Sequence, residues 1–201
     1  MIKSVIFDIG QVLVPFDWQR GYRALSAHSP YPPEEVRRRI KETGLFAVFE
    51  LGRIEPEALA RRICAILEME VGFEQFRELW SSIFLPETLV PEEMLSRLRA
   101  GCRLLLLSNT DVIHYTWLVG NYPIFRHFHD RVLSFELGCR KPEPEIYREA
   151  IARAGCHAGE IFFSDDRPEN VAGAIEAGID AVEFQSAAQI ERELTSRGLS
   201  F

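Results

Sequence analysis

The sequence predicts an α/β fold: a Rossmann-like parallel sheet of five strands with helices on both faces, and a small all-helical cap inserted after the first strand. Three observations lead to this prediction. The chain opens on a short apolar, β-branched run that ends at Asp8. Residues 15–85 are then dominated by helical periodicity, and from residue 86 onward apolar runs alternate with helical patterns. Such runs are typical of strands buried on both faces of a parallel sheet, whose connections are helices.

The inserted segment contains signals for several amphipathic helices. Asp17 is a typical N-cap for a helix over 18–27, and the run Pro32-Pro33-Glu34-Glu35 opens a second helix with prolines and an acidic first turn. Apolar side chains spaced three and four apart predict further helices over 55–69 and 73–84. We expect their apolar faces to form a core within the cap.

In the second part of the chain, strand patterns alternate with helix patterns. A short helix over 91–101 leads into a continuous apolar strand over 102–108. We therefore expect a discontinuous core, made of residues 1–14 and 86–201, around a cap of residues 15–85. Beyond the second strand the pattern predicts helix 112–120, strand 131–135, helix 143–154, strand 160–164, helix 168–177, strand 180–184 and a final polar helix.

The charge balance limits the classes of partner. The 201 residues carry a formal net charge of -7, with a pI near 5.3. A basic surface for nucleic acid is therefore not expected, and an anionic membrane would repel the chain. An anionic substrate would have to be held by local cations and a metal.

The sequence also limits where the protein is expected to act. It contains no apolar span of 18 residues and no signal-peptide pattern, because Asp8 interrupts the first apolar run. The four cysteines lack the spacing of a metal site, so we expect free thiols in a reducing compartment. Together these features predict a cytoplasmic protein. Its oligomeric state is not predicted.

Polar side chains recur where strands end. Asp8 follows the first strand, and a carboxylate there can attack phosphorus to form an acyl phosphate. The alternative is that Asp8 only caps the turn after the strand. Ser108 and Asn109 end the second strand and can donate hydrogen bonds to phosphate oxygens, although such strand endings are common.

A lysine and an acidic pair complete the set. Lys141 precedes a helix that begins with proline and could pair with a phosphate, but taken alone it is better explained as a solvated surface lysine. Asp165 and Asp166 end another strand. Burying these two carboxylates near Asp8 would be unfavourable without a cation, because like charges repel. Hard oxygen ligands without Cys or His favour Mg²⁺. Asp166 could also simply cap the next helix.

In this order, the four segments resemble the haloacid dehalogenase superfamily, whose motifs are a strand-terminal Asp, a Ser or Thr, a Lys and an acidic pair. The resemblance runs nearly end to end and is to the branch that includes bacterial α-D-glucose-1-phosphate phosphatase. The segments that carry it are 7–12, 107–110 with His114, 138–147, 162–170 and, in the cap, 49–54.

The resemblance implies a magnesium-dependent phosphatase that acts on a small phosphorylated metabolite, with a sugar 1-phosphate as one candidate. It also implies a role for each matching residue. Asp8 would be the nucleophile and a metal ligand, Ser108 and Asn109 would bind the phosphoryl group, Lys141 would balance charge and bind phosphate, and Asp165, Asp166 and the backbone carbonyl of Gly10 would complete the magnesium site.

One departure from the family pattern concerns the general acid/base. Most phosphatases of the superfamily have a second Asp two residues after the nucleophile, and here that residue is Gly10. Such a group contributes about 10²–10⁴-fold to the rate. Activity could persist on a leaving group that needs little help, such as that of a sugar 1-phosphate. Asp17 or His114 could supply the proton instead.

Two other functions stay open at this level. Gly10 is compatible with a non-catalytic phosphate-binding protein. A 2-haloacid dehalogenase also uses an Asp nucleophile without the second Asp, but it needs no metal, and the pair Asp165-Asp166 argues against it.

Overall fold

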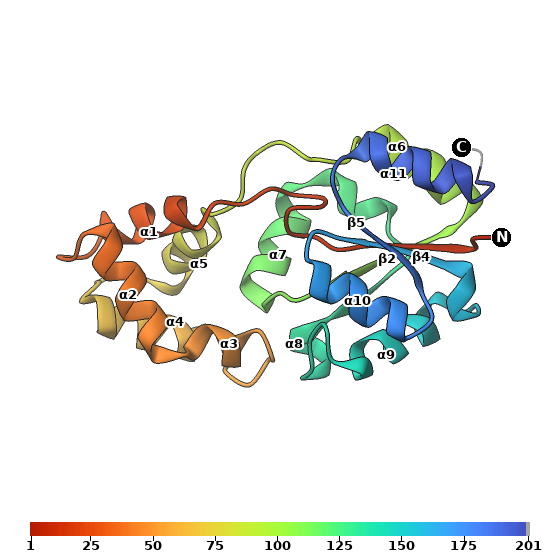
Figure 1. Cartoon of the computed structure of the whole chain (residues 1–201). Helices are drawn as coiled ribbons and strands as arrows, with labels where there is room; N and C mark the ends of the chain where they lie inside the picture. The colour runs from red at the N-terminus through yellow and green to blue at the C-terminus, as the bar shows by residue number, and fades with distance from the viewer. Residues whose placement is uncertain (200–201) are drawn as a thin grey trace.

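The computed structural model describes residues 1–199, which form a core and a cap joined by two segments (Figure 1). A single parallel sheet has the strand order β3-β2-β1-β4-β5. Phe7, the last residue of the central strand, pairs with Leu106 on one side and Ser164 on the other. The predicted fold class is confirmed. The strands are β1 (Ser4–Phe7), β2 (Arg103–Ser108), β3 (Asp130–Leu133), β4 (Ile161–Asp165) and β5 (Asp180–Glu183).

Helices cover both faces of the sheet because its strands are apolar on both sides. Val5 and Phe7 of β1 pack in one hydrophobic cluster with α6 and α11, whereas Ile6 packs in another with α9 and α10 (Figure 1). All three side chains are fully buried. The core helices are α6 (Glu92–Gly101), α7 (Val112–Asn121), α8 (Ser134–Leu137), α9 (Pro144–Ala154), α10 (Pro168–Glu176) and α11 (Ala187–Ser196), with 3-10 turns η1 (Pro123–His127) and η2 (Ala158–Glu160).

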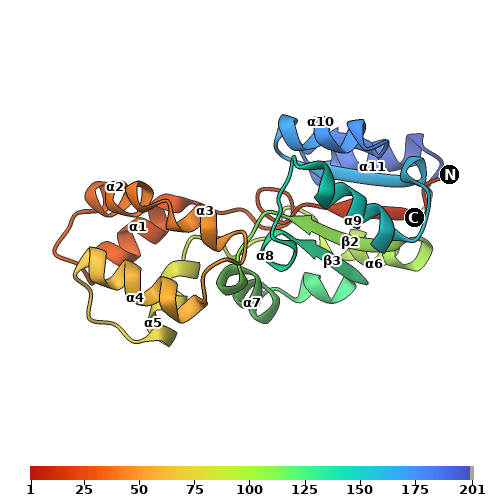
Figure 2. The same cartoon turned by 90° about the horizontal axis from the view of Figure 1, so that it is seen from below.

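The cap has a hydrophobic centre of its own, formed by side chains such as Leu59, Ile63 and Phe76. One core residue, Ile113 at the start of α7, joins this cluster. Figure 2 shows α7 at the boundary between cap and core. The cap helices are α1 (Trp18–Ser26), α2 (Pro33–Thr43), α3 (Leu45–Phe49), α4 (Pro56–Leu67) and α5 (Phe73–Ser81).

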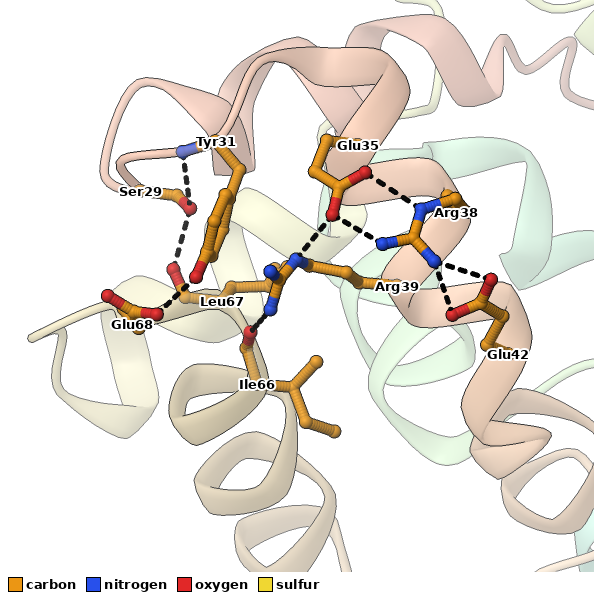
Figure 3. A network of polar contacts seen from close by, with 9 residues as sticks. All are labelled: Ser29, Tyr31, Glu35, Arg38, Arg39, Glu42, Ile66, Leu67 and Glu68. Carbon is orange, nitrogen blue, oxygen red and sulfur yellow. Dashed lines mark hydrogen bonds and ion pairs between the residues drawn. The ribbon is translucent and has the colours of Figure 1, made fainter.

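A polar network ties α2 to α4 on the outside of the cap (Figure 3). Arg39 donates hydrogen bonds to Glu35, at 2.7 Å, and to the carbonyl of Ile66, at 3.1 Å. Arg38 bridges Glu35 and Glu42 along α2. The contact from Arg39 supplies a hydrogen-bond donor to a carbonyl in the last turn of α4. Ser29 and Tyr31 extend it to Leu67 and Glu68 at the end of α4.

The two segments that join cap and core are paired with each other. Phe16 forms an antiparallel bridge with Phe84, and the Asp17 N–H donates to the Ile83 carbonyl at 2.9 Å. Leu85 donates to the carbonyl of Pro15 in the same way, at 3.0 Å. The cap therefore leaves and re-enters the core at one place, close to the carboxyl end of β1.

Two details differ from the sequence prediction. The third strand ends at Leu133, because residues 134–137 form the short helix α8, and the Ser134 hydroxyl accepts a hydrogen bond from the Thr110 N–H at 3.0 Å. Helix α3 was not predicted, because five residues are too few to show a periodicity. The four cysteines are free, and among residues 1–199 no helix combines the length and the apolar character needed to cross a membrane.

Candidate functional site

The site begins at the carboxyl ends of the central strands, where a lysine lies between two aspartates. The Nζ atom of Lys141 is 2.8 Å from Asp8 Oδ1 and 2.5 Å from Asp165 Oδ2, and it donates a third contact to the Leu107 carbonyl at 2.8 Å. Lys141 is 3% exposed. Burial lowers the pKa of Lys141, but the two carboxylates outweigh this and raise it. The ammonium is therefore held in its charged form.

The pKa of Asp8 is shifted in opposite directions by its surroundings. Burial raises the pKa of its carboxyl group, the Lys141 ammonium opposes this, and Asp165 adds to it. Asp8 Oδ1 is buried in an ion pair with Lys141, and within residues 1–199 no other group donates a hydrogen bond to it. The Asp8 carboxylate therefore keeps lone pairs that a further cation could share.

The two residues of the acidic pair have different surroundings. Asp165 is fully buried, and its Oδ1 accepts hydrogen bonds from the Arg167 N–H and the Asn170 side chain, both at 2.9 Å. Its other oxygen faces Lys141. Asp166 instead lines the open cavity, where burial and the charge of Asp165 raise the pKa of its carboxyl group.

Three carboxylates at this place fit a divalent cation. Asp8, Asp165 and Asp166 each offer an oxygen within 4.8 Å of the others. Within residues 1–199, Lys141 is the cation that contacts two of them, so the group keeps an excess of negative charge. The all-oxygen donor set suits Mg²⁺.

The second strand supplies the next polar groups. The Asn109 side chain and the Lys141 backbone exchange two hydrogen bonds, at 3.0 Å and 2.8 Å, so Asn109 positions the loop that carries the lysine. The second N–H of the Asn109 amide is left for a ligand. Ser108 is 3% exposed, and its neighbour Thr110 also borders the cavity.

A cavity of about 440 Å³ connects these groups to the cap. All predicted site residues except Asp165 line it, and Asp165 lies beneath them as the partner of Lys141. From the cap come the aromatic side chains of Trp18 and Phe46 and the carboxylate of Glu50. The core contributes two further cations, Arg140 and Arg167. The volume lies within the range of small-molecule sites.

Neither proposed replacement for the missing acid/base is free in this structure. Asp17 caps α1 by accepting from the Gln19 N–H at 2.8 Å, and it does not line the cavity. His114 lines the cavity, but its Nδ1 lies 2.7 Å from Asp111 Oδ2 and its Nε2 lies 3.1 Å from the Trp80 carbonyl. Burial lowers the pKa of His114, and the Asp111 carboxylate outweighs it, so the net shift is upward.

Gly10 has a packing reason to lack a side chain. A Cβ atom on this residue would lie 2.7 Å from Cε1 of Phe16, well inside van der Waals contact. Phe16 belongs to the segment that joins core and cap. The backbone here turns sharply, since Gln11 has a φ of 57°. The aromatic ring thus occupies the space where the family's second Asp would start.

Several polar residues of the cavity wall were missed from the sequence, among them Glu50, Arg140, Arg167 and Asn170. For Glu50 a signal existed in Gly52, which has a φ of 66° and a Cα so close to the core that a Cβ would lie 2.1 Å from the Phe135 carbonyl oxygen. A glycine in a predicted helical block marks such a turn. For the two arginines we find no sequence signal, because charged residues are common in loops.

The chain is similar to known phosphatases. Over 201 aligned residues, the chain is 25% identical to the D-ribitol-5-phosphate phosphatase of Bacteroides thetaiotaomicron, covering 97% of this chain and 98% of the relative. It is 25% identical to the chloroplast flavin mononucleotide hydrolase 1 of Arabidopsis thaliana, covering 99% of this chain and 79% of the relative.

A solved structure shares both the core and the cap. It is a wild-type haloacid dehalogenase family enzyme of Bacteroides thetaiotaomicron in complex with magnesium and inorganic phosphate. The TM-score is 0.82 at 28% sequence identity, and the match covers 92% of this chain and 96% of the other. A family model described as haloacid dehalogenase-like hydrolase matches residues 2–178. The chain therefore belongs to the haloacid dehalogenase-like hydrolases.

Proposed function

We propose that the protein is a magnesium-dependent phosphatase of small sugar or polyol phosphates, sugar 1-phosphates included, and that it works through an aspartyl-phosphate on Asp8. The observation that carries the proposal is the position of Asp8, which faces a cavity together with Ser108 and Lys141. The phosphatases and the magnesium–phosphate complex among its relatives support the same class of reaction.

We assign the core to residues 1–14 and 86–201 and the cap to residues 15–85. In the proposed reaction, an oxygen of Asp8 forms a bond to phosphorus while the bond from phosphorus to the substrate oxygen breaks. Water then attacks the same phosphorus, the bond to Asp8 breaks, and phosphate leaves. The cap would exclude bulk water during the first step.

Each core side chain has a defined task in this proposal. Lys141 keeps Asp8 ionised and offsets the charge of the phosphoryl group. Ser108 and the free N–H of Asn109 would donate to phosphate oxygens. Asp8, Asp166, Asp165 and the Gly10 carbonyl would hold Mg²⁺, which when bound screens the repulsion between phosphate and carboxylates.

The test is phosphate release from D-ribitol 5-phosphate, α-D-glucose 1-phosphate and p-nitrophenyl phosphate, each with Mg²⁺ and with EDTA. We expect turnover that needs the metal and falls by about 10⁴-fold or more in Asp8→Asn, because the nucleophile is lost. Asp130→Asn is the matched control. Asp130 starts β3, at the opposite edge of the sheet, and the control should keep full activity.

Three results would contradict the proposal. Phosphate release that is equal in wild type and Asp8→Asn would exclude Asp8 as the nucleophile. A phosphorylated Asp8 that forms but is never hydrolysed would indicate a phosphate-binding protein. Chloride release from 2-chloropropionate in EDTA would instead identify a dehalogenase.

A further inference from the structure

Glu50 brings a carboxylate from the cap into the active-site cavity. It follows helix α3, and its side chain is 16% exposed. The turn that begins there rests on the core. Gly52 lies against the Phe135 carbonyl, and Arg53 Nη2 contacts the Gly138 carbonyl at 3.5 Å. The position of Glu50 is therefore set by contact between cap and core.

The side of the cavity on which Glu50 lies matters for phosphoryl transfer. Asp8 and Ser108 reach the cavity from the sheet edge, whereas Glu50 reaches it from the cap together with Trp18 and Phe46. Attack by Asp8 requires the leaving oxygen to lie in line, on the far side of phosphorus. That side faces the cap. The water of the second step must approach along the same line.

Within residues 1–199, no group donates a hydrogen bond to the Glu50 carboxylate that would fix its charge. Arg140 Nη1 lies 3.8 Å from Glu50 Oε2, too far for a hydrogen bond. The other charged groups that face it are Asp111 and His114 of the α7 end and Arg167 of the loop after β4. Asp111 and His114 are already paired with each other.

The electrostatic surroundings suit a group that exchanges protons near neutral pH. Burial raises the pKa of Glu50 to about 7, and Asp111 adds to the rise, whereas Arg140, His114 and Arg167 oppose it. Both protonation states are then populated near neutral pH, which is the condition for acting as acid and then as base.

We propose that Glu50 is the catalytic proton donor and acceptor of this enzyme, in place of the Asp that most phosphatases of the superfamily have at the position of Gly10. The inference rests on the phosphatase function proposed above. In the first step the Glu50 carboxyl proton goes to the leaving oxygen as its bond to phosphorus breaks, giving an alcohol. In the second step the Glu50 carboxylate takes a proton from the water that attacks phosphorus, and Asp8 leaves as a carboxylate.

The experiment compares two leaving groups in Glu50→Gln. In single-turnover measurements with D-ribitol 5-phosphate, whose alkoxide must be protonated, we expect the rate of the first step to fall by about 10²–10⁴-fold. Nitrophenolate leaves p-nitrophenyl phosphate without being protonated. The rate of the nitrophenolate burst, which reports the first step, should therefore change less than about tenfold. The variant should then accumulate phosphorylated Asp8, because the second step has lost its base.

Controls separate a catalytic role from a structural one. Glu57→Gln, an exposed cap residue in the first turn of α4, should behave as wild type. Glu50→Asp should recover part of the lost rate with the alkyl phosphate. The wild-type rate of the first step should decline as pH rises through about 7, where Glu50 loses its proton, and Glu50→Gln should lose that limb.

Several outcomes would overturn the inference. Glu50 would be a binding or structural residue if Glu50→Gln lowered the rate of the first step equally with both substrates. A higher KM with kcat unchanged would lead to the same conclusion. An unchanged rate with the alkyl phosphate would exclude it altogether. A failure of the phosphatase function looks different, because wild type would then lack turnover that depends on Asp8 with either substrate.

Discussion

The core and the cap hold their charged groups in opposite ways. In the core, the Lys141 ammonium is buried between the carboxylates of Asp8 and Asp165, and each member of this cluster is less than a tenth exposed. In the cap, charged groups such as Glu35 and Arg38 form ion pairs on the outside (Figure 3). Glu50 brings a carboxylate from the cap into the cavity, and its ion pair with Arg140 is long, at 3.8 Å.

The contrast shows how the two sides of one cavity can have different tasks. A buried ion cluster keeps its geometry and its charges, which suits a nucleophile and a metal site. A carboxylate with a raised pKa and no tight partner changes its charge easily, which suits proton transfer. The following substitutions test this contrast in the core, in the segments that join core and cap, and on the outside of the cap.

The largest effect is expected for Lys141→Met in the core. Removing one partner of a buried ion cluster leaves Asp8 and Asp165 without their cation, which costs about 3–5 kcal/mol of unfolding free energy. Urea unfolding in EDTA measures the loss, and phosphate release should vanish. Mg²⁺ should restore part of the stability, because it supplies positive charge to the same carboxylates.

The pH dependence of this loss provides a second readout. Burial and the charge of Asp165 raise the pKa of Asp8, and Lys141 opposes this rise, so removing the lysine raises the folded-state pKa of Asp8 further. The variant should therefore lose stability relative to wild type as pH rises from the unfolded pKa of Asp8 through the folded one. Lys3→Met is the control, because Lys3 forms an exposed pair with Glu160 and should change stability little. A loss in Lys141→Met that is no larger than in Lys3→Met would contradict the buried-cluster interpretation.

An intermediate effect on stability is expected for Gly10→Ala, next to the segment that joins core and cap. The new Cβ would lie 2.7 Å from Phe16 Cε1, so we expect a loss of about 1–3 kcal/mol in unfolding free energy from overpacking. Phe16→Ala in the same chain should relieve the clash, and the double-mutant cycle gives the coupling. For the same reason, Gly10→Asp alone should not raise activity.

Gly101→Ala is the control for this change, since no atom lies within 4 Å of the Cβ it would add. If Gly10→Ala and Gly101→Ala had the same free energy of unfolding, the Phe16 ring would be able to move away from the new Cβ. Packing against Phe16 would then not explain why residue 10 is a glycine.

The smallest effect is expected for Glu35→Gln on the cap surface. Hydrogen bonds from Arg38 and Arg39 lower the pKa of Glu35 from 4.5 to about 2. A lowered pKa stabilises the folded state above the unfolded value, and this contribution is lost as pH falls toward the folded value. The melting temperature of the variant should thus lie slightly below that of wild type near neutral pH, and the difference should shrink between pH 4.5 and about 2.

Glu34→Gln controls for the loss of a negative charge in the first turn of α2, because Glu34 is exposed and forms no ion pair within residues 1–199. A difference between Glu35→Gln and wild type that does not depend on pH would mean that the ion pairs of Glu35 contribute nothing to stability.

Much of the fold followed from local signals. The fully buried runs of β1, β2 and β4 were recognisable because parallel strands covered on both faces are apolar throughout. Capping residues such as Asp17, and the prolines before α2, marked helix starts. Short elements such as α3 and α8 gave no such signal, because their positions depend on neighbours distant in sequence.

The polar residues at the base of the site were predictable from the sequence alone. Asp8 directly follows a strand and Ser108 and Asp165 each end one, and parallel pairing brings such ends to one edge, so their proximity followed from three apolar runs. The tertiary structure decided the rest. It buried Lys141, turned Asp166 rather than Asp165 to the cavity and brought Glu50 across from the cap. These features depend on loop geometry and on contacts between distant segments. Neighbouring residues indicate such contacts at most indirectly, as Gly52 does for the turn after Glu50.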